Sequence, residues 1–400
     1  MSTLNTTNIK HASSSSNSIV LAADGTCTVK ATNKSGHNLV TNGAFQIAQR
    51  STSSTESGYG SVDRFAVSHG NHDEAITHAQ VALTSSDTGP WAKGFRTALQ
   101  LTNGNQTSGA QAGSYCQIYQ KIEGQNLAQS GWDYTSASSY ITLSFWIKSS
   151  IAQNFYGHIR TSHGTEQLYV WETGSLSANT WTKITKTIPG NSNITVTNDA
   201  SATAYLFSFW PFAGTNLTGS VSLNTWAAYS SSTRLPDNTT TWWTTNDSTI
   251  AITGVQVEVG DTATDFEHRS YGEELVRCKR YFNMLANPAS ETYSDDKGRQ
   301  TIAWGQVNNV SSKYVYFSDI FDVPMRAAPS IHKVVGTSYF RIMIVGGANT
   351  TSDFDVQGTW TNCWEVRCTA VDAFAADDRG NAVKLVCFNS AARFGFSAEL

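Results

Sequence analysis

The feature that most constrains the fold of this 400-residue chain is an alternation of apolar and other residues with a period of two. In residues 141–148 one face carries Ile141, Leu143, Phe145 and Ile147, and the other carries Thr142, Ser144, Trp146 and Lys148. Because successive side chains of a strand point to opposite faces, this pattern predicts a half-buried antiparallel strand. Similar runs recur between residues 36 and 269, so we expect this region to form a β-sandwich.

Two of these runs depart from simple alternation. In residues 250–259 the apolar phase changes at Gly254, with Ile250 and Ile252 before it and Val255, Val257 and Val259 after it. A β-bulge at Gly254 would keep one buried face, and we predict one there. Residues 205–212 are largely apolar in both phases, which predicts a strand that is covered on both sides.

A helix is predicted between two β domains. Leu275, Cys278, Phe282 and Leu285 recur at helical spacing, and Ser270 with Glu273 forms an S-x-x-E capping box. We therefore expect a connecting helix over residues 270–286. Beyond it, alternating runs between proline and glycine turns predict a second β-sandwich over residues 287–400, so the fold class is all-β.

The charge balance argues against several partners. The chain has 27 Lys and Arg against 31 Asp and Glu, a net charge of −4 that is too weak to favour nucleic acid. No stretch is long enough to span a bilayer and no secretory signal is evident, so we expect synthesis in a cytoplasm and no membrane insertion. The six cysteines form no CxxC pair, and we expect neither a metal site nor a cofactor.

Residues 1–35 form a polar leader with one short apolar patch, Ile19, Val20 and Leu21. Such a segment cannot bury a core by itself, so it is either disordered or ordered by neighbouring chains. The alternation around Thr28–Lys30 allows a strand that pairs with a partner chain, and we favour this alternative.

Four blocks of this sequence resemble bacteriophage tail and fibre proteins. Residues 38–50 and 59–67, NLVTNGAFQIAQR and YGSVDRFAV, are similar to the opening of jelly-roll modules related to carbohydrate-binding modules. Residues 252–275, ITGVQVEVGDTATDFEHRSYGEEL, resemble the closing strand of that module. FDVPMRAAPS and the final FGFSAEL resemble a second domain of the same proteins, and residues 2–21 resemble segments that tie fibres to the virion.

The resemblance implies a jelly roll at residues 36–269 and a structural role in the virion tail. It also implies a homotrimer whose leader, through Ile19, Val20 and Leu21, binds tail adaptor or nozzle proteins. We expect the distal domains, the carboxy-terminal one first, to contact the host surface, where a glycan is the expected receptor. The resemblance transfers no receptor residue.

Aromatic residues in Ser/Thr-rich surroundings are candidates for stacking on sugar rings. They are the pairs Trp242 with Trp243, Trp360 with Trp364, Trp226 with Tyr229, and Trp210 with Phe212. We choose Trp360, Trp364, Trp242 and Trp243 as the glycan-binding candidates. The alternative for each is packing in a core, and for Trp210 that alternative is favoured.

No catalytic residue is predicted, because GxSxG, Walker A and HExxH patterns are absent. The carboxylates Asp63, Glu123, Glu166, Glu172 and Glu258 are scattered, and we expect Glu258 to point outward from its strand. His69, His72, Asp73, Glu74 and His78 match no metal-ligand spacing, so a solvated loop is favoured there. Two alternatives to a tail fibre remain open: a tailspike that depolymerises polysaccharide, and a head or collar appendage without a receptor role.

Overall fold

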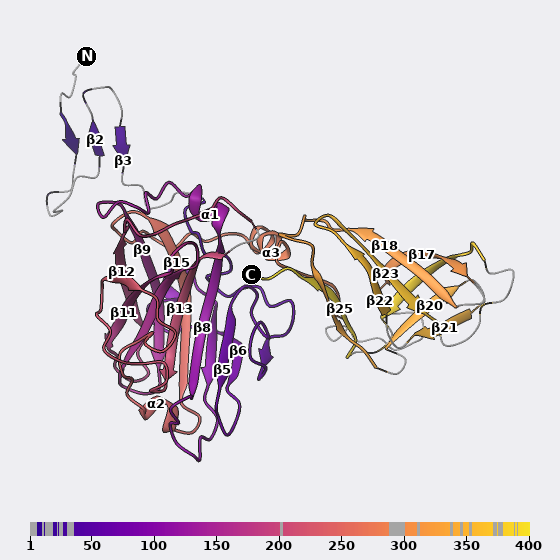
Figure 1. Cartoon of the computed structure of the whole chain (residues 1–400), viewed down its shortest axis with the longest axis horizontal. Coiled ribbons are helices and arrows are strands. Elements are labelled where there is room, and N and C mark those ends of the chain that lie inside the picture. Colours follow the sequence, from indigo (N-terminus) through magenta and orange to yellow (C-terminus); the bar gives the residue numbers. More distant parts are fainter. Residues whose placement is uncertain are drawn as a thin grey trace.

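The computed structural model consists almost entirely of antiparallel β-sheet. It describes residues 6–9, 12, 19–21, 23, 27–29, 36–200, 203–287, 301–309, 313–336, 339–344, 347–351, 354–370, 374, 379–387, 389 and 391–400. Two β domains lie side by side along the long axis, with the helix α3 between them and the leader strands projecting from the first (Figure 1). The predicted all-β class with two sandwiches is confirmed.

The first domain is a sandwich of two six-stranded sheets. One has the order β14-β11-β10-β13-β8-β5. Its strands are β5 (Ala66–Gly70), β8 (Tyr115–Glu123), β10 (Asn154–Thr161), β11 (Gln167–Ser175), β13 (Thr203–Ala213) and β14 (Trp226–Ala228). The other sheet has the order β12-β9-β15-β7-β6-β4. Its strands are β4 (Ser53–Ser54), β6 (Thr77–Ala82), β7 (Thr97–Thr102), β9 (Tyr140–Ser149), β12 (Thr182–Pro189) and β15 (Thr249–Val259).

The alternation in the sequence corresponds to the two sides of these strands. The four apolar residues of residues 141–148 are fully buried in the core between the sheets, as predicted. In β15 the register shifts between Thr253 and Gln256, and Gly254 has a φ of 67°, so the predicted bulge is confirmed. Residues of β13 are buried on both sides, because a loop after this strand covers part of the outer face of the sheet.

The second domain packs a seven-stranded sheet against a three-stranded one. The larger sheet has the order β21-β20-β24-β17-β18-β23-β22. Its strands are β17 (Thr301–Asn309), β18 (Tyr314–Ile320), β20 (Phe340–Ile344), β21 (Gly347–Thr351), β22 (Phe354–Thr359), β23 (Cys363–Thr369) and β24 (Ala382–Cys387). The smaller sheet consists of β16 (Phe282–Ala286), β25 (Arg393–Ser397) and β19 (Ser330–Val334).

The connecting helix is shorter than predicted. Helix α3 (Tyr271–Lys279) begins with the predicted capping box of Ser270 and Glu273. Phe282 and Leu285 belong instead to strand β16, which pairs with β25. The helical spacing was therefore misleading beyond Lys279. A short apolar run fits a helix or a strand, and pairing with β25 of the second domain makes these residues a strand.

Polar contacts join the two domains. Arg64 of the jelly roll forms an ion pair with Glu399, and both side chains are buried. The Nε2 of Gln49 donates a hydrogen bond to the carbonyl of Phe282 at 2.7 Å, and the Nζ of Lys121 donates one to the main-chain oxygen of Leu400 at 2.8 Å. Residues from the far end of the chain thus lie against β8 of the jelly roll.

The described part of the leader forms a small sheet of β1 (Asn8–Ile9), β2 (Ile19–Leu21) and β3 (Cys27–Val29). Strand β3 pairs along one edge with β2 of the same chain and is the edge strand of this sheet. Pairing of this segment with a partner chain stays a prediction, and Lys30 lies outside the described residues. Val20 and Leu21 are each 40% exposed. Within the described residues, no helix is long and apolar enough to cross a membrane.

Candidate functional site: a cationic hollow on the jelly roll

A hollow of about 160 Å³ lies on the outer face of the sheet that contains β8, β13 and β10. It is lined by nine residues: Ser68, Gln117, Tyr119, Lys121, His158, Arg160, Leu206, Tyr229 and Arg234. We call these residues the cationic hollow. Its floor follows from strand alternation, because Gln117, Tyr119 and Lys121 of β8 point away from a core that holds Ile118 and Ile122.

The wall of the hollow comes from the loop that follows β14. Apolar packing of Leu235 on Leu168 and Val170 of β11 holds this loop on the sheet. The backbone amides of Tyr229 and Arg234 donate hydrogen bonds to the carbonyls of Glu166 and Leu217 at 2.9 and 2.8 Å. The loop is therefore fixed at both wall residues, so their side chains are positioned before any ligand arrives.

Three cations meet in the hollow. The guanidinium of Arg160 stacks 3.7 Å from the ring centroid of Tyr229, and its Nη2 contacts the Oε2 of Glu166 at 2.6 Å. Arg234 forms no ion pair with a carboxylate of a described residue. Lys121 contacts the main-chain oxygen of Leu400 at 2.8 Å. Burial lowers the pKa of Lys121, and the positive charges of Arg160 and Arg64 act in the same direction. The nearby charge of Glu399 acts to raise this pKa. The site therefore holds an excess of positive charge.

Buried polar atoms without a hydrogen-bond partner gather at this place. They include the Nδ1 of His158, the Nε of Arg160 and, beside the hollow, the Nε1 of Trp210. Burial lowers the pKa of His158 to about 3, helped by the charges of Arg234 and Arg160, so its ring is neutral at physiological pH. A buried donor or acceptor without a partner costs free energy, and several of them at one hollow indicate a binding function.

The volume sets a limit on what the hollow encloses. Sites that enclose a whole drug-sized molecule have volumes of roughly 300–1,000 Å³. A hollow of about 160 Å³ on an open sheet face instead fits one unit of a longer molecule that lies across the strands.

Trp242 and Trp243 are not available for stacking on a surface sugar. We expected them on a strand, where one ring would be exposed, but they lie in the short helix α2 (Thr241–Thr244) and both are fully buried. The ring of Trp243 stacks on Phe212 at 5.0 Å. The pair closes one end of the jelly-roll core, because a helical turn places both rings over the ends of the two sheets.

Trp360 and Trp364 are separated by the structure. Trp364 is buried in β23 against Phe394 and Phe396, whereas Trp360 is 53% exposed in the turn between β22 and β23. The expected shared strand face is wrong, because the chain reverses between the two residues. Trp364 is therefore a core residue, and Trp360 alone of the four chosen tryptophans remains a candidate for surface contact.

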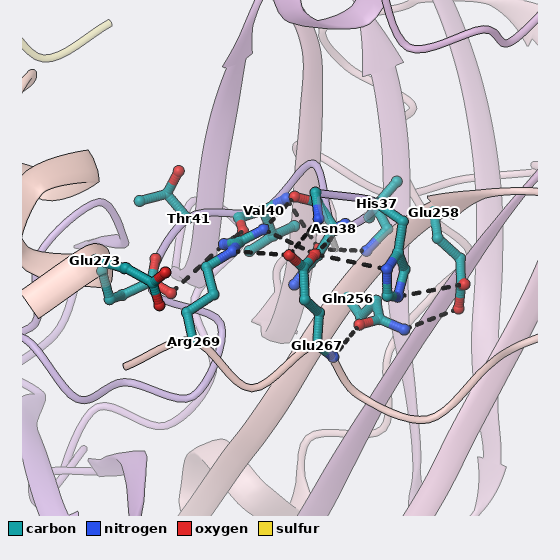
Figure 2. Close-up of polar contacts among 12 residues, drawn as sticks. His37, Asn38, Val40, Thr41, Gln256, Glu258, Glu267, Arg269 and Glu273 are labelled. Atoms are coloured by element: carbon teal, nitrogen blue, oxygen red, sulfur yellow. Dashed lines mark hydrogen bonds and ion pairs between the residues drawn. The ribbon is translucent and has the colours of Figure 1, made fainter. Parts of the chain in front are cut away.

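A carboxylate-rich network near the start of the jelly roll is structural in its contacts (Figure 2). Glu267 accepts hydrogen bonds from the backbone amides of Gly36 and Asn38 at 2.5 and 2.8 Å and pairs with Arg269. Glu258, which we expected to point outward, is buried and accepts a bond from the hydroxyl of Thr264 at 2.7 Å. Each carboxylate is thus already engaged in holding residues 36–40 against β15.

The predicted solvated loop at residues 69–78 is only partly loop. His69 lies on β5 and His78 on β6, and both are buried. His78 shares a hydrogen bond with the hydroxyl of Ser61 at 2.6 Å, and burial lowers the pKa of His69 to about 4. Within the described ranges, no group of three or more such side chains is arranged to hold a metal ion.

A second hollow, of about 300 Å³, lies on the outer face of the other jelly-roll sheet. Its rings pack on one another, with Phe95, Phe266 and His268 at centroid distances of 4.9 Å. Of its two lysines, Lys93 contacts Asp265 at 3.5 Å and Lys183 is exposed. The rings and Lys93 already have partners, and we therefore prefer the cationic hollow as the binding site.

No known protein family and no curated protein matches this chain. Solved structures that are similar to it include tailspike protein 4 of bacteriophage CBA120, at 13% identity and a TM-score of 0.29 over 56% of this chain and 21% of that one. A putative sugar-binding protein from Bacteroides thetaiotaomicron matches at 10% identity and 0.30, over 56% and 100%. The module TmCBM61, in complex with β-1,4-galactotriose, matches at 13% identity and 0.26, over 57% and 100%.

Sequence reasoning named only one residue of the cationic hollow, Tyr229, as a candidate for sugar stacking. It missed Tyr119, Lys121, Arg160 and Arg234. The alternation in YCQIYQK, residues 115–121, could have placed Tyr119 and Lys121 on one outward face. No pattern in the sequence would have placed Arg234, more than a hundred residues later, beside them.

Proposed function

We propose that this chain is a tail-fibre subunit of a bacteriophage that binds a surface glycan of the host through the cationic hollow, without cleaving it. The observation that supports binding is the meeting of two tyrosine rings, three cations and a buried, unpartnered histidine nitrogen in one fixed hollow. Tyrosine rings cover the apolar faces of sugars, and charged or polar side chains bond their substituents. The place in the tail rests on the resemblance of the four sequence blocks.

The test measures binding of the purified full-length chain to host cells before and after periodate oxidation of their surface glycans. Binding should fall after oxidation. Replacing Tyr119 or Tyr229 by Ala should weaken binding to untreated cells about five- to tenfold, since aromatic contacts contribute about 1 kcal/mol beyond the area they bury. Tyr271→Ala is the control, because Tyr271 is an exposed ring on helix α3, outside the hollow.

Binding that survives periodate, or that is unaffected by both hollow variants, would contradict glycan recognition at this site. The depolymerase alternative predicts release of reducing ends from host polysaccharide, which the proposed function excludes. Glu166 is the acidic residue bound to Arg160, so Glu166→Gln would identify whether any release depends on the hollow. The appendage alternative predicts no binding to cells, and labelled virions would show a signal at the head or collar.

We also propose that the subunit is a homotrimer, since an elongated fibre of sandwiches needs contacts between chains to align its domains. Light scattering at micromolar concentration should give three times the 43.4 kDa mass of the chain. A monomer mass would refute this arrangement.

A further inference from the structure

The cationic hollow also indicates which kind of glycan is bound, an inference that rests on the proposed function. We infer that it takes an acidic sugar unit, one that carries a carboxylate or phosphate group, with Arg234 as the cation that receives the anion.

The three cations of the hollow differ in the partners that they already have. Arg160 already has a carboxylate partner in Glu166 and a ring partner in Tyr229. Arg234 donates from its Nε to the carbonyl of Ser231 at 3.0 Å, and Lys121 donates to the main-chain oxygen of Leu400. Arg234 therefore has a neutral acceptor and retains donors for an anion, since a guanidinium has five N–H groups. Lys121 is already close to a negative charge, that of Glu399, and adds to the positive field as a second cation.

A neutral histidine, His158, lines the hollow beside these cations. His158 is almost completely buried, and its Nδ1 has no partner. A neutral imidazole has one donor and one acceptor nitrogen, so it can bond a sugar hydroxyl beside the anion. The charges of Arg234 and Arg160 disfavour a positive charge on this ring, and the same two charges favour a negative ligand beside it.

The hollow on the opposite sheet differs from the cationic hollow in its charged side chains. There Lys93 is paired with Asp265, and both are well exposed. That hollow is lined by two lysines, one of them paired, and by no arginine, whereas the cationic hollow is lined by two arginines and a lysine. The same fold thus presents one site suited to an anion and one that is not.

The experiment uses the full-length chain on an array of bacterial surface glycans. Each acidic glycan is printed beside its carboxyl-reduced form, if it carries a uronic acid, or its dephosphorylated form, if it carries a phosphate. We expect binding to the acidic member of at least one pair, weakened about tenfold by the matching treatment, because charge-assisted hydrogen bonds are roughly twice as strong as neutral ones. The pair that responds identifies whether the anion is a carboxylate or a phosphate.

Variants connect this preference to the hollow. Arg234→Gln should weaken binding to the acidic glycan about tenfold and leave its neutral counterpart within about twofold. Arg234→Lys should restore part of the loss, and raised salt should weaken the wild type more than Arg234→Gln. Lys183→Gln is the matched control, because Lys183 is an exposed lysine that lines the opposite hollow.

Equal binding to both members of every pair, with no effect of Arg234→Gln, would overturn the acidic preference and leave glycan binding in place. Binding to no glycan on the array would count against the proposed function and the inference together. If the acidic preference persists unchanged in Arg234→Gln while Lys183→Gln abolishes it, the site is on the opposite sheet and the inference is wrong.

Discussion

The cationic hollow and the outer face of the seven-stranded sheet are two different kinds of surface on one chain. The hollow is recessed, and a covering loop holds its wall. The seven-stranded sheet instead exposes Trp304 by 68% and Ile320 by 75%, with Tyr316 on the same face. Exposed apolar residues provide contact area, but the hollow combines fixed rings, a guanidinium without a carboxylate partner and buried polar atoms without a hydrogen-bond partner. The difference shows that exposure and a formed site are separate properties.

The largest expected effect separates core from surface tryptophans in the second domain. Trp364→Ala should lower the free energy of unfolding by about 3 to 5 kcal/mol, because it leaves a cavity beneath Phe394 and Phe396. Trp304→Ala should change it by less than about 0.5 kcal/mol, as exposed substitutions usually do. Denaturant unfolding of the full chain measures both. Similar losses for the two variants would mean that Trp304 also supports the core.

A second prediction concerns pH, because buried histidines are concentrated in the jelly roll. Burial lowers the pKa of His158 to about 3 and of His69 to about 4, and it also lowers that of His78. The folded domain keeps these rings neutral, whereas the unfolded chain protonates them below pH 6.5. Stability is therefore complete above pH 6.5 and falls as pH decreases, by up to about 1.4 kcal/mol per pH unit for each histidine.

Asp63 opposes part of this loss. Burial raises its pKa to about 6, so the folded state takes up this proton first and gains stability as pH falls from about 6 towards 3.8. Because three histidines lose stability and one aspartate gains it, the free energy of unfolding of the jelly roll still decreases as pH falls. Amide hydrogen exchange at pH 7.5 and 5.5, compared after correction for the intrinsic exchange rate at each pH, should show a lower free energy of opening for jelly-roll peptides at pH 5.5. His158→Gln should reduce by about one the number of protons taken up on unfolding. Equal changes in both domains would contradict the prediction.

A third prediction decides between the two surfaces for host contact. The chain order favoured the carboxy-terminal domain, which carries the exposed Trp304 and Trp360. If the hollow is the contact, Trp304→Ala and Trp360→Ala should each leave adsorption to cells within about twofold, while Arg234→Gln lowers it about tenfold. The reverse pattern would move the receptor site to the second domain.

The smallest expected effect on folding is that of removing the leader. The contacts that hold the start of the jelly roll begin at Gly36, whose amide bonds Glu267 (Figure 2). Deleting residues 1–35 should therefore leave the stability of both domains unchanged. We expect the truncated protein to be absent from purified particles, because the half-buried Ile19 and the exposed Val20 and Leu21 are the proposed contact with the tail. Normal incorporation, measured by blotting virions, would refute that role.

Parts of the fold were predictable because they depend on local chemistry. The buried face of β9, the bulge at Gly254 and the capping box of Ser270 and Glu273 all follow from spacing within about ten residues. The end of helix α3 was not predictable in this way, since Phe282 and Leu285 fit a helical stripe as well as a strand. Pairing with β25, more than a hundred residues later, decided the matter.

The tryptophans show the same division. Residue type marked Trp242, Trp243, Trp360 and Trp364 as possible sugar contacts, yet burial depends on what the rest of the chain places over each ring. Helix α2 and the turn at Trp360 gave the four rings three different surroundings.

The sequence by itself determined the β class, the division into two domains and the faces of single strands, because alternation and turn chemistry act between near neighbours. Only the tertiary structure decided where a binding site could form. Lys121, Arg160 and Arg234 come from three separate segments, and each alone is an ordinary surface cation. These three side chains produce a combined positive potential only after strand pairing and loop packing place them on one face. Electrostatic interactions depend on distance in space and not on separation along the chain.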